Sequence, residues 1–214
     1  MPATPTNKKI INIIIWIITT ACVIFFVFGD YLKLAGYAIS IILIMLPSYL
    51  FDNWRGFKKK FTLEFTEKFQ LVIAIACYFN LLGSTDFYFL NSRTNWYDTV
   101  VHFINPLMLF IFTAAIPILI QKIIFKKTWL WVTIICNLIL IVFFSFTWEF
   151  YESFIDTIFK HSYMFGDNSG IFWDTIEDLA ADFAGGIFAC WLIYSRFYGY
   201  IVKNVRINSS YESF

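Results

Sequence analysis

Charged side chains and several familiar site signatures are scarce or absent in this sequence. Only 14% of its 214 residues are charged, and it has two histidines and four cysteines. The cysteines stand singly in apolar segments, so they predict small core residues rather than disulfides or a zinc site. Two histidines are too few for a histidine-box desaturase, and neither G-x-S-x-G nor the paired E-x-x-H motif of di-iron bundles occurs. No basic cluster predicts a nucleic-acid partner.

Apolar length is what the sequence has in abundance. Hydrophobic residues make up 59% of the chain, and the mean hydropathy is +0.68. Apolar runs of about 20 residues, the length that crosses a bilayer, recur along it. We therefore predict an all-α, polytopic membrane protein with one integral membrane domain over residues 1–214 and six transmembrane helices. The predicted spans cover residues 10–28, 34–51, 69–89, 98–120, 128–154 and 174–202.

Basic residues are distributed unevenly between the two sides of this predicted arrangement. With the N-terminus in the cytoplasm, only Lys33, Arg93 and Lys160 of the 16 Lys and Arg residues fall on the outer side, and the other 13 fall in cytoplasmic segments. Cytoplasmic loops of membrane proteins carry such an excess of Lys and Arg. The bias predicts both termini in the cytoplasm and a multi-pass protein of the cell membrane.

The last predicted span opens with an acidic stretch that is unusual for a membrane helix. Asp174, Asp178 and Asp182 follow one another at intervals of four residues, so a helix places them on one face. Carboxylates inside a membrane are costly and usually face a bundle interior or a watery cavity. We therefore interpret this stripe as part of a functional site.

Two other predicted spans carry polar side chains at the same end. Asp98 and His102 are four residues apart at the start of the fourth span, and Glu149 and Glu152 are three apart near the end of the fifth. The predicted topology places both pairs at the extracytoplasmic side, with the aspartate stripe. We call the seven residues the acidic–histidine cluster: Asp98, His102, Glu149, Glu152, Asp174, Asp178 and Asp182.

So many carboxylates beside so few basic groups are not buried together as bare anions. Either several are protonated or a cation neutralises them, and a divalent metal is the simplest solution. Carboxylate oxygens with one imidazole suit Mg²⁺, Mn²⁺, Zn²⁺, Ca²⁺ or Fe²⁺. The predicted metal ligands are Asp98, His102, Glu149, Asp174, Asp178 and Asp182. The predicted catalytic residues, acting as general bases or acids, are Glu149, Glu152 and His102.

Simpler roles are also open for some of these residues. Asp98 and Asp174 stand where an aspartate would cap a helix N-terminus. His102 taken alone is compatible with an ordinary interior histidine. Glu177 lies off the aspartate stripe, which predicts a solvated side chain. The pair Gly185 and Gly186 predicts close helix packing.

The motifs of the last three spans resemble those of the YjdF-like bacterial inner-membrane proteins. The matching segments are Tyr97-Asp98-x-x-x-His102-Phe103, Glu149-x-x-Glu152, and Trp173-Asp174-x-x-x-Asp178-Leu179 followed by Gly185. VanZ-like proteins show a similar, looser order. The resemblance implies a bacterial cytoplasmic membrane but supplies no biochemical activity. Asp182 departs from the YjdF-like pattern, which is not fixed at that position.

Three functions are compatible with these observations. The first is an enzyme in which a divalent metal at the outer leaflet acts on a membrane lipid or a lipid-linked envelope precursor. The second is a cation- or proton-coupled transporter, for which Asn105, Pro106, Pro117 and Asn137 would mark a route inward. The third is a non-catalytic accessory protein that a metal stabilises. Transport needs a polar route across the membrane, whereas an enzyme needs only an outer pocket.

Overall fold

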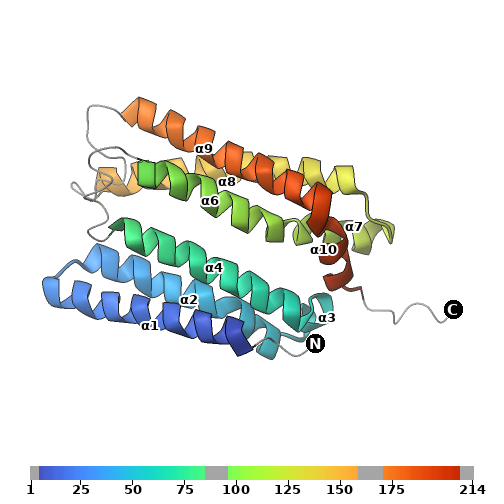
Figure 1. Cartoon of the computed structure of the whole chain (residues 1–214), viewed down its shortest axis with the longest axis horizontal. Coiled ribbons are helices and arrows are strands. Elements are labelled where there is room, and N and C mark those ends of the chain that lie inside the picture. Colours follow the sequence, from blue (N-terminus) through green and yellow to red (C-terminus); the bar gives the residue numbers. More distant parts are fainter. Residues whose placement is uncertain (1–4, 85–95, 159–170, 208–214) are drawn as a thin grey trace. The chain divides into compact units, whose positions relative to one another are not determined.

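The protein is all-helical over the residues that the structure describes. A computed structural model of the chain describes residues 5–84, 96–158 and 171–207, and no strand occurs in these ranges (Figure 1). The prediction of an all-α protein is confirmed. The helices are α1 (Pro5–Phe28), α2 (Tyr31–Asn53), α3 (Arg55–Lys60), α4 (Leu63–Ser84), α6 (Trp96–Thr113), α7 (Ala115–Phe125), α8 (Leu130–Ile158), α9 (Ile171–Leu192), the π-helical η1 (Ile193–Phe197) and α10 (Tyr198–Asn204).

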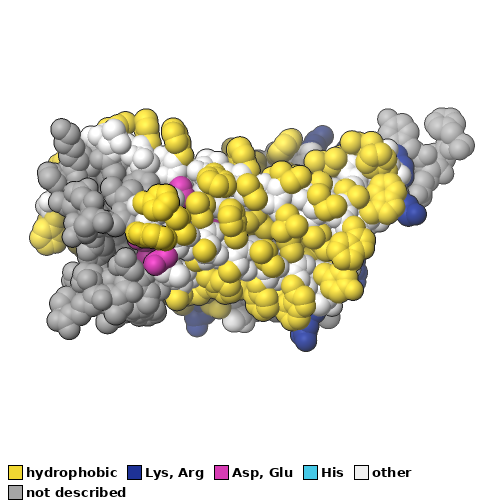
Figure 2. All heavy atoms as spheres, turned by 90° about the horizontal axis from the view of Figure 1, so that it is seen from above, with side chains coloured by type: hydrophobic (Ala, Val, Ile, Leu, Met, Phe, Trp, Pro, Cys, Tyr) yellow, Lys and Arg dark blue, Asp and Glu magenta, His cyan; other side chains and the backbone are white. Residues whose placement is uncertain are grey.

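Five segments of the described chain are long and apolar enough to cross a membrane by length and composition. They are Thr6–Phe28, Tyr31–Asn53, Leu63–Gly83, Tyr97–Phe125 and Leu130–Ile155. Helix α9 has a spanning length of 22 residues, but its early turns contain Asp174, Glu177, Asp178 and Asp182, which lower its apolar character. Figure 2 shows a largely hydrophobic face with acidic side chains near one end. These features fit a multi-pass membrane protein.

The chain divides into two compact units. Unit 1 comprises Met1–Tyr88, Ile118–Thr128 and Gly199–Phe214, and unit 2 comprises Phe89–Pro117 and Trp129–Tyr198. Unit 1 therefore contains α1 to α4 with most of α7 and α10. Unit 2 contains α6, α8 and α9, the three helices that carry the acidic–histidine cluster.

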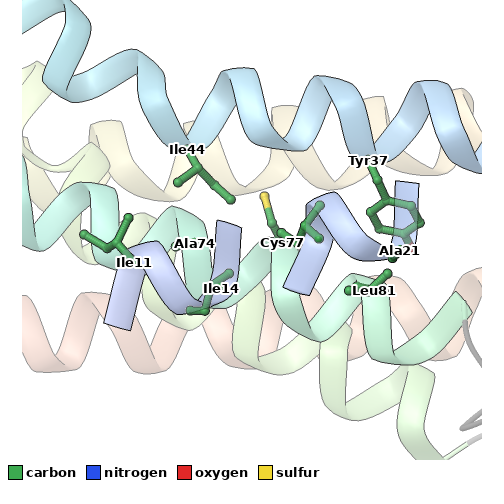
Figure 3. Packing of buried hydrophobic residues seen from close by; sticks show 9 residues of the cluster. Ile11, Ile14, Ala21, Tyr37, Ile44, Ala74, Cys77 and Leu81 are labelled. Carbon is green, nitrogen blue, oxygen red and sulfur yellow. The ribbon is translucent and has the colours of Figure 1, made fainter. Parts of the chain in front are cut away.

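The core of unit 1 is a three-helix packing of α1, α2 and α4. Ile18 from α1, Ile44 from α2 and Ala74 from α4 are completely buried in one apolar cluster, whose members Figure 3 shows. Cys77 lies in the same core, as predicted for an isolated cysteine in an apolar run. The core is mostly aliphatic and also contains the Tyr37 ring, while alanines such as Ala74 allow the helices to approach closely.

The α1–α2 connection is shorter than predicted. Gly29 adopts a positive φ of 74°, and the Asp30 N–H donates to the Phe25 carbonyl at 2.9 Å, which ends α1 with a left-handed turn. Asp30 then accepts a hydrogen bond from the Lys33 N–H at 3.2 Å and caps α2. Helix α2 consequently begins at Tyr31, three residues before the predicted span.

The third predicted span begins too late, at residue 69 instead of Leu63. The Thr62 hydroxyl oxygen accepts a hydrogen bond from the Phe65 N–H at 3.2 Å, so the helix is capped before its polar residues. Glu64 and Lys68 form an ion pair at 2.9 Å across one turn of α4. The predicted span omits this first turn because its charged residues lower the apolar character of the segment.

The basic segments of unit 1 meet at one end. The Thr62 N–H donates to the Asn204 carbonyl at 3.2 Å, and the Arg206 N–H donates to the Lys60 carbonyl at 2.7 Å. Lys122 Nζ donates to the carbonyl oxygens of Val202 and Val205 at 2.7 and 2.6 Å. These segments, which the Lys and Arg bias predicts to be cytoplasmic, are thus neighbours in this unit.

Unit 2 depends on two glycines, as predicted. A Cβ atom on Gly185 would clash with the carbonyl oxygen of Phe103 in α6. A Cβ atom on Gly186 would lie 2.6 Å from the side chain of Ile141 in α8. Helix α9 therefore approaches both neighbours at adjacent positions, and the space allows only hydrogen there.

Candidate functional site

The residues of the acidic–histidine cluster lie near one end of unit 2. Helices α6 and α9 begin at the end where α8 finishes (Figure 1). Helical spacing then places Asp98 and His102 on one face of α6, and Asp178 and Asp182 on one face of α9. Because Gly185 and Gly186 hold α9 tightly against its neighbours, these side chains converge.

His102 lies at the centre of the arrangement. Its Nδ1 atom is 3.1 Å from Asp182 Oδ1, a hydrogen-bonding distance. An ionised carboxylate only accepts, so this contact requires the proton on Nδ1. The other ring nitrogen, Nε2, is 3.9 Å from Asp98 Oδ1 and 3.9 Å from Asp178 Oδ2, which is too far for a hydrogen bond. The two edges of the imidazole therefore face different carboxylates.

Two groups of potential metal ligands share His102. One consists of Asp98, His102 and Asp178, and the other of His102, Glu149 and Glu152; in each, one ligand atom per residue lies within 4.8 Å of the others. Ligands bound at about 2.1 Å to one ion lie no more than about 4.2 Å apart. The 3.9 Å separations at Nε2 satisfy that limit. The two groups contain four of the six predicted ligands, and Asp174 and Asp182 belong to neither.

The cluster is largely closed to solvent. His102, Glu149, Glu152, Asp178 and Asp182 are only 4–7% exposed. The side chain of Asp98 is 38% exposed and forms the open side of the group. Within the described part of the chain, the ion pairs of these carboxylates involve His102 and no lysine or arginine.

Glu149 has an incompletely satisfied environment. Both of its carboxylate oxygens are buried and accept no hydrogen bond of normal geometry from the described residues. The Thr175 side chain lies near enough to interact with this carboxylate, but outside the geometric limits of a hydrogen bond. Buried polar atoms without partners are uncommon and often mark an ion or a water. Glu149 is therefore oriented into the site with ligand capacity to spare.

Ser145 is a polar neighbour that sequence reasoning missed. It lies one turn from Glu149 on α8, is 3% exposed, and its hydroxyl has no hydrogen-bond partner among the described residues. The signal was present in the sequence, because a serine four residues before a glutamate shares its helical face. Ser145 extends the polar surface of the site one turn further from the end of α8.

The remaining predicted site residue, Asp174, lies at the edge of the cluster. It is half-buried in the first turn of α9 and belongs to neither group of close ligand atoms. Glu177 is exposed, as predicted. The interpretation of Asp98 and Asp174 as N-caps is wrong, because α6 begins at Trp96 and α9 at Ile171. Both aspartates still lie in a first turn, where the helix dipole favours negative charge.

Other residues used in the sequence argument lie outside the described ranges. These are Arg93 and Lys160, which the orientation argument places on the outer side.

Comparison with known proteins identifies one family. Residues 11–198 match the family model described as "Predicted membrane protein (DUF2238)", which is the family of the YjdF-like proteins. No curated protein and no solved structure matches the chain. The looser similarity to VanZ-like proteins stays a prediction.

Proposed function

The chain belongs to the DUF2238 family of predicted membrane proteins, and we propose that its acidic–histidine cluster binds a divalent cation at the outer face of the cell membrane. We further propose that this site acts on a lipid or a lipid-linked precursor of the cell envelope. Such molecules reach the depth at which membrane helices begin.

The observation that carries the proposal is the buried carboxylate of Glu149, which has no hydrogen-bond partner among the described residues and belongs to one of the two ligand groups. Leaving a buried carboxylate without donors costs free energy, and a bound cation removes that cost. Glu149 and Glu152 form the second ligand group with His102, and Asp98 and Asp178 form the first with the same histidine. A single ion near His102 would neutralise charge from all three helices.

The geometry favours different roles for the predicted ligands. Asp98, Asp178 and Nε2 of His102 are placed to hold the ion. Asp182, predicted from its spacing as a ligand, contacts Nδ1 on the opposite edge of the ring. Metal-binding histidines commonly donate their second N–H to a carboxylate, which fixes ring orientation and tautomer. We therefore assign Asp182 to orienting His102, and Asp174 to the rim of the site.

The cation would supply Lewis acidity and an activated water at this site. Glu149 and Glu152 have the chemistry and the position of a general base or acid beside it. Because both are buried, a proton that they hold is shielded from bulk water. The ligand set of several oxygens with one nitrogen suits Mg²⁺, Mn²⁺, Zn²⁺, Ca²⁺ or Fe²⁺.

The charged residues at the two ends of one apolar segment support an outward-facing site. Lys122 lies near one end of the apolar segment Tyr97–Phe125, and Asp98 lies near the other. The Lys122 end contacts the basic segment around Val202 and Val205. If these basic segments are cytoplasmic, as Lys and Arg bias predicts, the start of α6 faces outward. A topology with six spans and both termini inside satisfies this arrangement.

The residues of unit 2 favour a closed site at the helix ends over a polar transport route across the membrane. The buried face of α8 is polar at Glu149 and Ser145, but the next residue on that face, Ile141, is 2% exposed and packs against Gly186. Beyond it, the Asn137 amide donates to the Phe110 carbonyl at 2.9 Å and its oxygen accepts from Thr113 at 3.0 Å. These bonds stabilise the break between α6 and α7, so Asn137 has a structural role.

Elemental analysis of the purified full-length protein tests the proposal. We expect near-stoichiometric divalent metal in the wild type and in Glu177→Gln, an exposed neighbour that serves as the matched control. Asp178→Asn should lose the metal while its circular dichroism stays helical. Absence of metal from folded wild type, or its retention in Asp178→Asn, would contradict the proposal.

A further inference from the structure

A dense group of basic residues lies in the connection between α2 and α4 in unit 1. Helix α3 has the sequence Arg-Gly-Phe-Lys-Lys-Lys, so four of its six residues are basic. A fifth basic residue, Arg206, is held beside α3, because its N–H donates to the Lys60 carbonyl at 2.7 Å and the neighbouring residues Phe61 and Val205 pair in a β-bridge. We call the five basic residues the basic platform: Arg55, Lys58, Lys59, Lys60 and Arg206.

The positive charges of the basic platform are not neutralised within the described part of the chain. Its side chains are exposed or half-buried, and no ion pair joins any of them to a carboxylate of the described residues. The nearest carboxylates along the chain are Asp52, which is exposed, and Glu64, which pairs with Lys68 at 2.9 Å. Arg55 and Lys59 are four residues apart, a spacing at which like charges destabilise a helix. Anions from outside the described chain would therefore stabilise α3.

The basic platform is confined to the surface of the bilayer. The apolar segment Tyr31–Asn53 ends directly before Trp54, and the apolar segment Leu63–Gly83 begins directly after Thr62. So short a connection between two membrane-crossing segments keeps α3 at the depth of the lipid head groups. Trp54 is 59% exposed and its ring stacks on that of Phe57 at 6.4 Å, and exposed tryptophan is typical of the membrane–water interface.

The anionic groups available at this depth are lipid phosphates. Groups of four to eight Lys and Arg residues beside the cytoplasmic end of a membrane helix attract anionic head groups, and the Lys and Arg bias predicts that this end is cytoplasmic. We infer that the basic platform binds the head groups of anionic phospholipids in the cytoplasmic leaflet. A purely topological signal needs only basic residues somewhere in the loop, whereas here backbone hydrogen bonds fix Arg206, from the far end of the sequence, beside α3. The inference does not depend on the proposed cation site.

The test compares phosphatidylglycerol with phosphatidylcholine of the same acyl chains, bound to the full-length protein in detergent and measured by native mass spectrometry. The test variant replaces the three lysines of α3 by glutamine. The matched control replaces three exposed lysines elsewhere in unit 1 by glutamine: Lys9, Lys126 and Lys127. A second test variant combines Lys59→Gln with Arg206→Gln, both at exposed positions, and serves if the first does not fold. Circular dichroism accompanies each variant.

We expect wild type and the control variant to bind phosphatidylglycerol at least about tenfold more tightly than phosphatidylcholine. The test variants should lose most of this preference while they stay helical. Equal affinity of wild type for the two lipids would overturn the inference, and so would a full preference in folded test variants. An equal loss in test and control variants would also overturn it, because binding would then follow net charge rather than the basic platform.

Discussion

The Nδ1 atom of His102 lies 3.1 Å from Asp182 Oδ1, on the ring edge opposite the nitrogen that faces Asp98 and Asp178. This contact separates two aspartates that share one face of α9. In the proposed cation site Asp178 would be a ligand, whereas Asp182 would orient the imidazole of His102.

Changing Asp182 should therefore weaken metal binding without removing it. In Asp182→Ala the imidazole loses its hydrogen-bond acceptor, so the tautomer and ring orientation are no longer fixed. We expect the metal affinity to fall about 10- to 100-fold, the usual effect of losing such an outer partner. Isothermal titration with Mn²⁺ measures this change beside Asp178→Asn, which should show no binding. Equal, complete loss in both variants would mean that Asp182 is itself a ligand.

Gly185→Ala should disrupt the packing of α6 against α9. The added methyl group meets the carbonyl oxygen of Phe103, which cannot move without shifting the helix backbone. We expect destabilisation on the order of 3 kcal/mol and a weakened metal site. Thermal unfolding of the purified protein measures the first effect. Gly36→Ala is the matched control, because nothing lies within 4 Å of a Cβ atom there; it should keep its Tm or raise it slightly.

The variant Asn137→Ala tests whether the Asn137 amide stabilises the fold or lines a transport route. The substitution removes the donor to the Phe110 carbonyl and the acceptor for Thr113, so we expect a loss of about 1–3 kcal/mol in unfolding free energy. Metal content should be unchanged, because Ile141 and Gly186 lie between this amide and the cluster. A stable Asn137→Ala protein whose metal uptake into vesicles is abolished would favour transport instead.

Cysteine labelling measures on which side of the membrane the site lies. In a variant whose four cysteines are replaced by alanine, Glu177→Cys should react with a membrane-impermeant thiol reagent added to intact cells. Lys203→Cys should react only after the membrane is opened. Both positions are exposed, so accessibility to the reagent depends on the side of the membrane. The reverse pattern would invert the predicted topology and place the site in the cytoplasm.

Helical periodicity was sufficient to predict much of this molecule. Apolar runs predict the long helices, and spacings of three and four residues place Asp98 with His102, Glu149 with Glu152, and Asp178 with Asp182 on one face of their helices. The packing role of Gly185 and Gly186 was also predictable, because glycine pairs in apolar helices allow close approach. These features depend on one helix at a time or on a general rule of helix contact.

Features that depend on atomic contacts between helices were not predictable. Spacing places Asp178 and Asp182 on one face, but it does not show that His102 from α6 presents a different nitrogen to each. The early start of α4 was missed because its first turn is charged, and the Thr62 cap is visible only in three dimensions.

Pulsed electron paramagnetic resonance of the Mn²⁺-loaded, full-length protein tests the central claim most directly. The account predicts a hyperfine signal from one directly bound imidazole nitrogen in wild type and in Glu177→Gln. The signal should disappear in His102→Gln. Failure of folded wild type to bind Mn²⁺, or bound Mn²⁺ without a nitrogen signal, would contradict a cation site built around His102.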